Sequence, residues 1–403
     1  MPSPSPSGKV AVYASVGPSL THYEADIEAC ALRQMPGTVS VPENVQYAWP
    51  DAAGAYLYVA SSNVAKNVKP AAPSHHRAAF RIDPDSGSLA PHGAPIPLPW
   101  RPVHLTLDQE GRHAIVVYPS PSRATVHRIL GDGRFGDDVP QSADLETGVF
   151  PHQVRMLPSG RRVVIVTRGN NASAEKSEDP GALKIFQYHD GILKNEATVA
   201  PGGGYGFGPR HVDFDPAGHW LYAALERQNR LQVFKLDKDM PGASPQFERE
   251  TLAEPQKVNT HQMVGTVHVH PVGKFIYVAN RASDTIAFEG QRVFAGGENT
   301  LSVYAVDQQT GEPTLIQRAD LHSYHVRTFA IDPSGRMLVA ASISAINVRD
   351  GAGITSVPAR LTTYRIAGDG KLSFANQYDV ETSSDRRMFW MGMVRRGHMD
   401  GSR

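Results

Sequence analysis

The sequence predicts an all-β fold, a seven-bladed β-propeller with four-stranded blades. The first observation is a recurring unit: an apolar strand, then Asp or His, often Pro, one further residue, Gly, and a second strand ending in Tyr-Val-Ala or a similar triplet. The second observation is the period of this unit, because its turn glycines are 49 to 62 residues apart. They are Gly54, Gly111, Gly160, Gly218, Gly273 and Gly335. A period of this length, divided among four strands, is typical of a propeller blade.

Six complete copies of the two-strand unit follow one another along the chain. They cover Val45–Ala60, Pro102–Val117, Pro151–Thr167, Pro209–Ala224, Val267–Asn280 and Arg327–Ala341. A third strand then follows, as in Leu231–Leu236, Leu301–Val306 and Leu361–Ile366. Asp-Gly pairs such as Asp190-Gly191 supply the positive φ that a tight turn into a fourth strand needs. Four strands per unit therefore account for the period.

Two strands are left over, one near each end of the sequence. Lys9–Val16 is typical of a second strand without a first, and Met388–Val394 of a first strand without a second. Joining them completes a seventh blade, and a closed ring removes the exposed edge of an open sheet. We therefore expect one propeller domain over residues 9–396, with a flexible N-terminal tail at 1–8 and a C-terminal tail at 397–403.

The composition of the sequence limits the binding partners and the cellular compartment that we expect for the protein. The 40 basic and 40 acidic residues cancel, so there is no general attraction to nucleic acid. No apolar run approaches the ~18–20 residues of a membrane span, and we expect no membrane partner. The single cysteine, Cys30, excludes an intrachain disulfide framework, and the first eight residues lack the features of a secretory signal. We expect a cytoplasmic protein, either a monomer or a small homo-oligomer.

Strand order predicts where functional side chains gather. The first strand of each unit runs toward the turn glycine and the second returns, so residues about eight before and eight after that glycine should meet on the opposite face, near the central channel. Rigid strand ends that carry loops are common places for function. The candidate site residues at these positions, or one residue beyond, are His104, His152, Gln153, Arg168, Arg210, His211, Glu226, Arg281 and Arg327.

Two segments carry a more specific resemblance. Residues 208–226, which open with Gly-Pro-Arg-His, and residues 270–281, which open with His-Pro-Val-Gly, resemble consecutive blades of the lactonase family. This family includes bacterial 6-phosphogluconolactonase and the fungal carboxy-cis,cis-muconate cyclases. The resemblance extends over nearly the whole chain, and it implies a propeller enzyme. The His, Arg, Glu and Arg proposed as the family's active-site set fall on His152, Arg210, Glu226 and Arg281.

These residue types suit the chemistry of an anionic lactone. The planar fork of arginine holds a carboxylate or phosphate at two points, so Arg210 and Arg281 are expected to bind the substrate, with support from Arg327 and Arg168. His152 titrates in the useful range and is the expected general acid/base.

Three roles are open to Glu226: orienting His152, holding an arginine, or donating a proton if burial raises its pKa. His104, His211 and Gln153 complete the expected substrate contacts. The competing interpretation for each of these histidines and arginines is structural, because such residues often tie neighbouring blades together.

Metal binding is not expected, since no His-x-His pair or cysteine cluster falls on the channel register together with carboxylates. We expect no other cofactor. The first functional hypothesis is a metal-independent lactonase that hydrolyses a small carboxylated or phosphorylated lactone at the channel mouth. The second is a cycloisomerase that closes a carboxylated muconate to its lactone. The third is a non-catalytic propeller that binds a ligand or a protein. The first two share the same residues, so the sequence separates them poorly.

Overall fold

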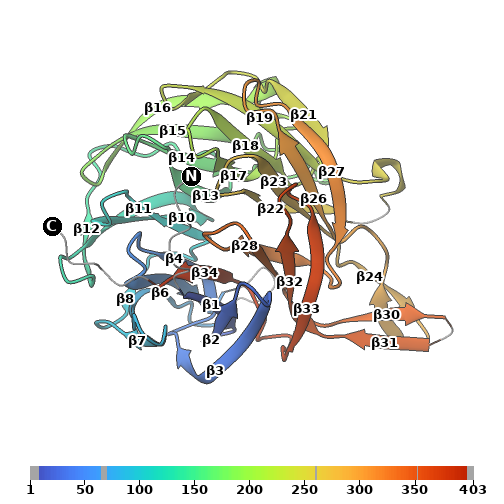
Figure 1. The fold of residues 1–403 in the computed structure, drawn as a ribbon. Coiled ribbons are helices and arrows are strands. Elements are labelled where there is room, and N and C mark those ends of the chain that lie inside the picture. The colour runs from blue at the N-terminus through green and yellow to red at the C-terminus, as the bar shows by residue number, and fades with distance from the viewer. Residues whose placement is uncertain (1–8, 65–69, 259–260, 352, 397–403) are drawn as a thin grey trace.

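The computed structural model describes residues 9–64, 70–258, 261–351 and 353–396, so the expected tails at 1–8 and 397–403 lie outside it. Within these ranges the chain forms seven antiparallel blades arranged in a ring (Figure 1). The helical content of the same ranges is two 3-10 turns, η1 (Pro201–Gly204) and η2 (Pro255–Lys257). The predicted all-β, seven-bladed architecture is confirmed.

The first three blades run in sequence order from the innermost strand outward. Blade 1 contains β4 (Val45–Pro50), β5 (Tyr56–Ser62), β6 (His75–Ile82) and β7 (Leu89–Pro91), with β8 (Ile96–Pro97) also paired to β6. Blade 2 contains β9 (His104–Leu107), β10 (His113–Pro119), β11 (Ser122–Ile129) and β12 (Phe135–Val139). Blade 3 contains β13 (Pro151–Met156), β14 (Arg162–Thr167), β15 (Ala182–His189) and β16 (Ile192–Val199).

The next three blades carry short additional strands. Blade 4 contains β17 (Pro209–Phe214), β18 (Trp220–Leu225), β19 (Arg230–Asp237) and β21 (Phe247–Glu250), with β20 (Met240–Pro241) also on β19. Blade 5 contains β22 (Met263–Val269), β23 (Phe275–Arg281), β26 (Thr300–Val306) and β27 (Pro313–Asp320). Blade 6 contains β28 (Val326–Ile331), β29 (Met337–Ser342), β32 (Ala359–Ile366) and β33 (Leu372–Val380).

Blades 5 and 6 each carry an inserted hairpin after their second strand. The hairpins are β24 (Thr285–Phe288) with β25 (Gln291–Phe294), and β30 (Ile346–Asp350) with β31 (Gly353–Val357). The two contact each other, and the Arg349 guanidinium lies 4.5 Å from the centre of the Phe288 ring. Figure 1 shows β30 and β31 projecting outward, beyond the ring of blades.

Blade 7 closes the ring with strands from both ends of the described chain. It contains β34 (Met391–Arg395), β1 (Val10–Val16), β2 (Ser19–Asp26) and β3 (Ala31–Ser40), in this order from the inside outward. β34 is antiparallel to β1, with Val10 opposite Arg395 and Ala14 opposite Met391. The two leftover strands therefore do share one blade, as the sequence predicted.

The hydrophobic core lies between the blades. Seven clusters of buried apolar side chains each combine residues from two neighbouring blades, one cluster for each junction in the described chain. The repeated tyrosine of the second strand adds a polar link. The hydroxyl groups of Tyr58 and Tyr277 donate hydrogen bonds of 2.9 and 2.8 Å to the carbonyls of Gly133 and Gly370, in the outer turn of the next blade. The repeat residues therefore fasten each blade to the next.

The aspartate of the repeat holds the turn between the first two strands. Asp215 Oδ1 accepts hydrogen bonds from the amides of His219 and Trp220 at 2.7 and 2.6 Å, and Gly218 takes a φ of +72° that favours glycine. His270 replaces this aspartate in blade 5. Its Nδ1 accepts from the amide of Val272 at 3.2 Å, so imidazole substitutes for carboxylate as the turn acceptor.

Within the described residues, no helix is long and apolar enough to cross a membrane.

Candidate active site

The predicted register of the inner strands is confirmed by their pairing. Pro151 lies opposite Thr167 in blade 3, Pro209 opposite Leu225 in blade 4, and Met263 opposite Arg281 in blade 5. The start of each first strand and the end of each second strand therefore lie together, at the face away from the turn glycines. This face is called the site face below.

A β-bulge occurs at the start of several inner strands, and its extra residue is the one eight before the turn glycine. The pairing register skips His152 in β13, Arg210 in β17 and Arg327 in β28. The same happens at Gln46 in β4. A bulge takes a side chain out of the regular alternation of a strand and is common beside active sites. It explains how long polar side chains fit at the crowded inner edge of the blades.

Three arginines converge on the carboxylate of Glu226, which follows β18 and is 3% exposed. Arg168 Nη1 donates to Glu226 Oε2 at 2.6 Å, and Arg281 Nη2 donates to Oε1 at 2.6 Å. Arg210 Nε lies 3.1 Å from the same Oε1, which makes an ion pair, but its N–H does not point at the oxygen with hydrogen-bond geometry. One carboxylate therefore neutralises part of the charge of three guanidinium groups.

The charges of this cluster shift the pKa values of its members. Burial by itself raises the pKa of Glu226, but the guanidinium groups of Arg281, Arg168 and Arg210 outweigh burial and bring the pKa to about 2. Burial and then the charge of Arg281 lower the pKa of Arg210 to about 9. Glu226 is therefore ionised at neutral pH. Of its three expected roles, the contacts favour holding arginines and argue against donating a proton.

The three predicted histidines form a row beside the cluster. The ring of His211 lies 5.3 Å from the ring of His152 and 5.9 Å from that of His104, which packs on Tyr47 at 3.8 Å. Burial, followed by the charges of Arg210 and Arg168, lowers the pKa of His152 well below 6.5, so the expectation that His152 titrates in the useful range is wrong. Burial is also the largest cause of the low pKa values of His104 and His211. All three are neutral at pH 7.

Two predicted site residues make contacts that join blades. Arg327 Nη1 donates to the carbonyl of Phe389 at 2.6 Å, and its guanidinium lies 3.6 Å from the centre of the Phe389 ring. Gln153 Oε1 accepts from the amide of Val212 at 2.6 Å, which links β13 to β17. The structure therefore brings Arg168, Arg210, Glu226 and Arg281 into direct contact, places the histidines beside them, and engages Gln153 in a link between blades.

The sequence prediction missed two residues that contact the cluster and one that binds Gln46 in blade 1. Each stands ten before a turn glycine, two before the position considered. The Arg168 guanidinium lies 4.1 Å from the centre of the Phe150 ring. His325 Nε2 accepts a hydrogen bond from Arg281 Nη1 at 3.1 Å. Arg101 donates from Nε and Nη2 to Gln46 Oε1 at 3.1 and 3.0 Å. Extending the same register by two residues would have found all three.

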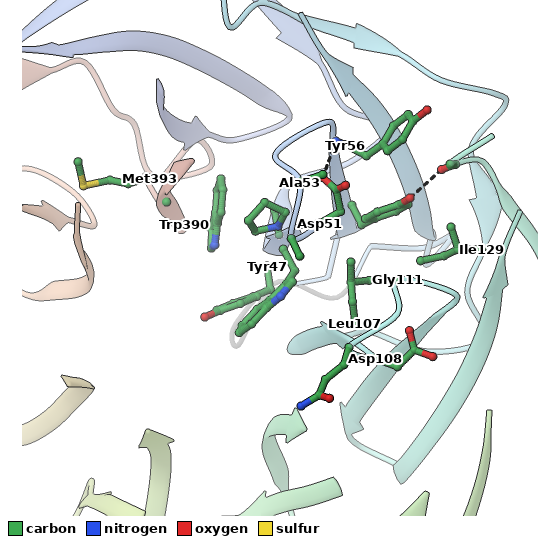
Figure 2. Close-up of a pocket in the computed structure, with 18 of the residues that line it drawn as sticks. Tyr47, Asp51, Ala53, Tyr56, Leu107, Asp108, Gly111, Ile129, Trp390 and Met393 are labelled. Atoms are coloured by element: carbon green, nitrogen blue, oxygen red, sulfur yellow. Dashed lines mark hydrogen bonds between the residues drawn. The ribbon is translucent and has the colours of Figure 1, made fainter. Parts of the chain in front are cut away.

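A large cleft opens among the turns on the opposite face and extends inward to Tyr47, Thr266 and Thr328 of the inner strands. It has a volume of about 910 Å³, and its lining includes the turn residues Asp51, Asp108 and Gly111 together with Tyr56 and Trp390 (Figure 2). None of the nine predicted site residues lines it. Its walls are mainly aromatic and aliphatic, which suits an apolar ligand better than a small anion. We therefore retain the arginine cluster as the candidate active site.

Potential metal ligands are not grouped in the described part of the chain. No set of three or more His, Cys, Asp or Glu side chains comes together there in a way that could hold a metal ion. The carboxylate of Glu226 faces guanidinium groups, which compete with any cation for its oxygens.

Fold and site together define a class of protein: a seven-bladed propeller with a buried, arginine-rich centre where the inner strands of adjacent blades begin. Residues 10–349 match the family described as lactonase, 7-bladed β-propeller. The chain belongs to this lactonase family.

Similar proteins agree with this membership. A 6-phosphogluconolactonase of Bacillus subtilis is 26% identical over 269 residues, which cover 66% of this chain and 70% of the relative. A 6-phosphogluconolactonase of Pectobacterium carotovorum is 27% identical over 264 residues, covering 65% and 69%. The solved structure of a periplasmic gluconolactonase of Pseudomonas aeruginosa superposes with a TM-score of 0.69 at 18% identity, covering 96% of this chain and 99% of that one.

Proposed function

We propose that this protein is a metal-independent lactonase that hydrolyses a small carboxylated or phosphorylated lactone at the arginine cluster. The observation that carries the proposal is the surplus of buried positive charge around Glu226, where Arg168, Arg210 and Arg281 share one carboxylate. Membership of the lactonase family supports the reaction type, and relatives described as 6-phosphogluconolactonases support an anionic substrate.

The buried donors of the arginines support anion binding. Among the described residues, Nε and Nη1 of Arg210, Nε of Arg168 and Nε of Arg281 are buried without a hydrogen-bond acceptor. Leaving a charged donor without an acceptor is costly, and a carboxylate or phosphate supplies several acceptor oxygens at once. Arg210 has the most donors to offer, since Arg168 and Arg281 each donate to Glu226. We assign Arg210 as the main anion contact and Arg281 as its partner.

His152 is the proposed general base. Its low pKa keeps the imidazole neutral at pH 7, and neutral imidazole can accept a proton from the attacking water. Water then adds to the lactone carbonyl, and the arginines stabilise the negative charge that develops on its oxygen. The ring C–O bond breaks as the carbonyl reforms, and the leaving oxygen takes the proton from His152. The product is the open hydroxy acid. Once its new carboxyl group ionises, it carries one more anionic group than the substrate.

A substrate comparison tests the proposal. We expect acid release, followed at constant pH, with 6-phosphogluconolactone or a carboxylated lactone from aromatic catabolism. The value of kcat/KM should exceed that for uncharged δ-gluconolactone by at least about tenfold, because each ionic contact is worth about 1.5–3 kcal/mol. Equal rates for charged and uncharged lactones would contradict the assigned role of the arginines.

The same assay series separates the alternatives. Ultraviolet spectroscopy with 3-carboxymuconate would reveal ring closure instead of hydrolysis, since closing the ring shortens the conjugated diene and lowers its absorbance at longer wavelength. Binding of these compounds without any turnover would favour a non-catalytic propeller. A cytoplasmic location, together with a monomeric or small oligomeric state, remains our prediction. It is tested by fractionation of the source cells and by light scattering of the purified protein.

A further inference from the structure

His325 makes a direct contact with the arginine cluster. It lies between β27 and β28, and its Nε2 is 3.1 Å from Nη1 of Arg281. A guanidinium group can only donate hydrogen bonds, so Nε2 must be the acceptor and the proton of the neutral ring is on Nδ1. The contact therefore fixes the tautomer of His325 as well as its position.

The backbone at His325 is fixed in the conformation that allows this contact. Its φ is +53°, a left-handed conformation that is uncommon outside glycine, although histidine, asparagine and aspartate adopt it more often than other residues do. Asn299 Oδ1 accepts from the amide of His325 at 2.8 Å and from the amide of Ala282 at 3.1 Å. Ala282 directly follows Arg281. One side-chain oxygen thus ties the imidazole and the arginine it contacts into a single unit, at the cost of an unusual backbone conformation.

The consequence for Arg281 is that its guanidinium group is held from two sides. Nη2 donates to Glu226 at 2.6 Å, and Nη1 donates to His325. Arg168 is held in a comparable way, between Glu226 and the ring of Phe150, which stands at the same place in its own blade. A neutral acceptor orients Arg281 without cancelling its charge, which a second carboxylate would do.

We propose that His325 is a positioning residue that aligns Arg281 to receive the anionic group of the substrate. This inference rests on the proposed lactonase function and adds a residue to its site. His325 acts through Arg281, so its loss should weaken ground-state binding of the anion and leave the chemical step almost unchanged.

Two variants of similar polarity separate this role from a structural one. In His325→Gln, the side-chain amide oxygen reaches the place of Nε2 and can accept from Arg281. In His325→Asn, the shorter side chain tolerates the left-handed backbone but cannot reach Arg281. We expect His325→Asn to raise KM by about 10- to 100-fold, the value of one hydrogen bond to a charged group, with kcat within about threefold. His325→Gln should restore KM to within about threefold of wild type.

Two further measurements make the test independent of turnover. Calorimetric affinities for 6-phosphogluconate and citrate should show the same difference between the Asn and Gln variants. In wild type at pH 7, ¹⁵N NMR of histidine should find Nε2 of His325 unprotonated and Nδ1 protonated, the signal being assigned by its loss in His325→Gln.

Each outcome supports or overturns the positioning role of His325. Equal KM and equal affinities in both variants and wild type, equal losses in both variants, or a proton on Nε2 would overturn the positioning role. If wild type hydrolyses no lactone but the affinity difference is found, the proposed function fails and the positioning role stands. If wild type neither turns over a lactone nor binds either anion, both are overturned.

Discussion

Replacing Glu226 by Gln should destabilise the fold by about 3 kcal/mol, because it removes the counter-charge of three buried arginines. The arginines bring the pKa of Glu226 from 4.5 to about 2, and each pKa unit corresponds to about 1.4 kcal/mol. Breaking a buried ion pair by removing one partner costs about 3–5 kcal/mol in general, which agrees. With an unfolding entropy of about 2 cal/mol/K per residue, a loss of 3 kcal/mol lowers Tm of a chain this long by roughly 4 °C.

Thermal unfolding followed by circular dichroism measures this change. The matched control is Glu248→Gln, which removes a carboxylate that pairs with Arg230 at a partly exposed site. Such exposed pairs are worth about 0–1 kcal/mol, so Tm should fall by about 1 °C or less. Phosphate should stabilise Glu226→Gln more than it stabilises wild type, because the anion takes the place of the carboxylate among the arginines. Equal losses of Tm in the two variants, or no additional effect of phosphate, would refute the argument.

Further predictions concern catalysis and pH. His152→Ala should lower kcat by about 10²–10⁴ with an unchanged circular dichroism spectrum, and unchanged turnover would remove His152 from the mechanism. Arg210→Lys keeps the charge but loses the planar fork, so KM for an anionic lactone should rise by about tenfold or more, whereas Arg249→Lys at the surface should leave KM unchanged. His104, His152 and His211 have lower pKa values folded than unfolded, so the unfolded chain binds more protons below pH 6.5. Urea denaturation should therefore show the free energy of unfolding decreasing by about 1.4 kcal/mol per histidine between pH 8 and pH 5.5, and a constant value would contradict their burial in the neutral form.

The fold was predictable because its signals are local. Each turn needs a glycine with positive φ, as at Gly218, and an acceptor such as Asp215 for the turn amides, so both recur once per blade. The two leftover strands could be joined because an open ring would expose β1 along one edge. The packing of the two inserted hairpins on each other depends on contacts between blades, such as that of Arg349 with Phe288, which the repeat does not encode.

The candidate site was predictable only in part. The register placed Arg210, Glu226 and Arg281 together because antiparallel pairing fixes which strand ends meet. It gave no indication that Gln153 would bond to the neighbouring strand, since the bulge at His152 changes the direction of the residues around it. Phe150 and His325 were missed for a different reason. Both have positive φ in loops before an inner strand, and they stand two residues ahead of the positions that the register considered.

The pairing of β34 with β1 also sets the order in which the blades can be completed during folding. A nascent chain can form its first six blades one after another, but until β34 emerges β1 has no inner neighbour and blade 7 is incomplete. Trp390, which is buried between blades 7 and 1, arrives at the same late moment. Until β34 is made, a growing polypeptide therefore exposes the unpaired edge of β1, and in that interval it is open to chaperones, proteases and self-association.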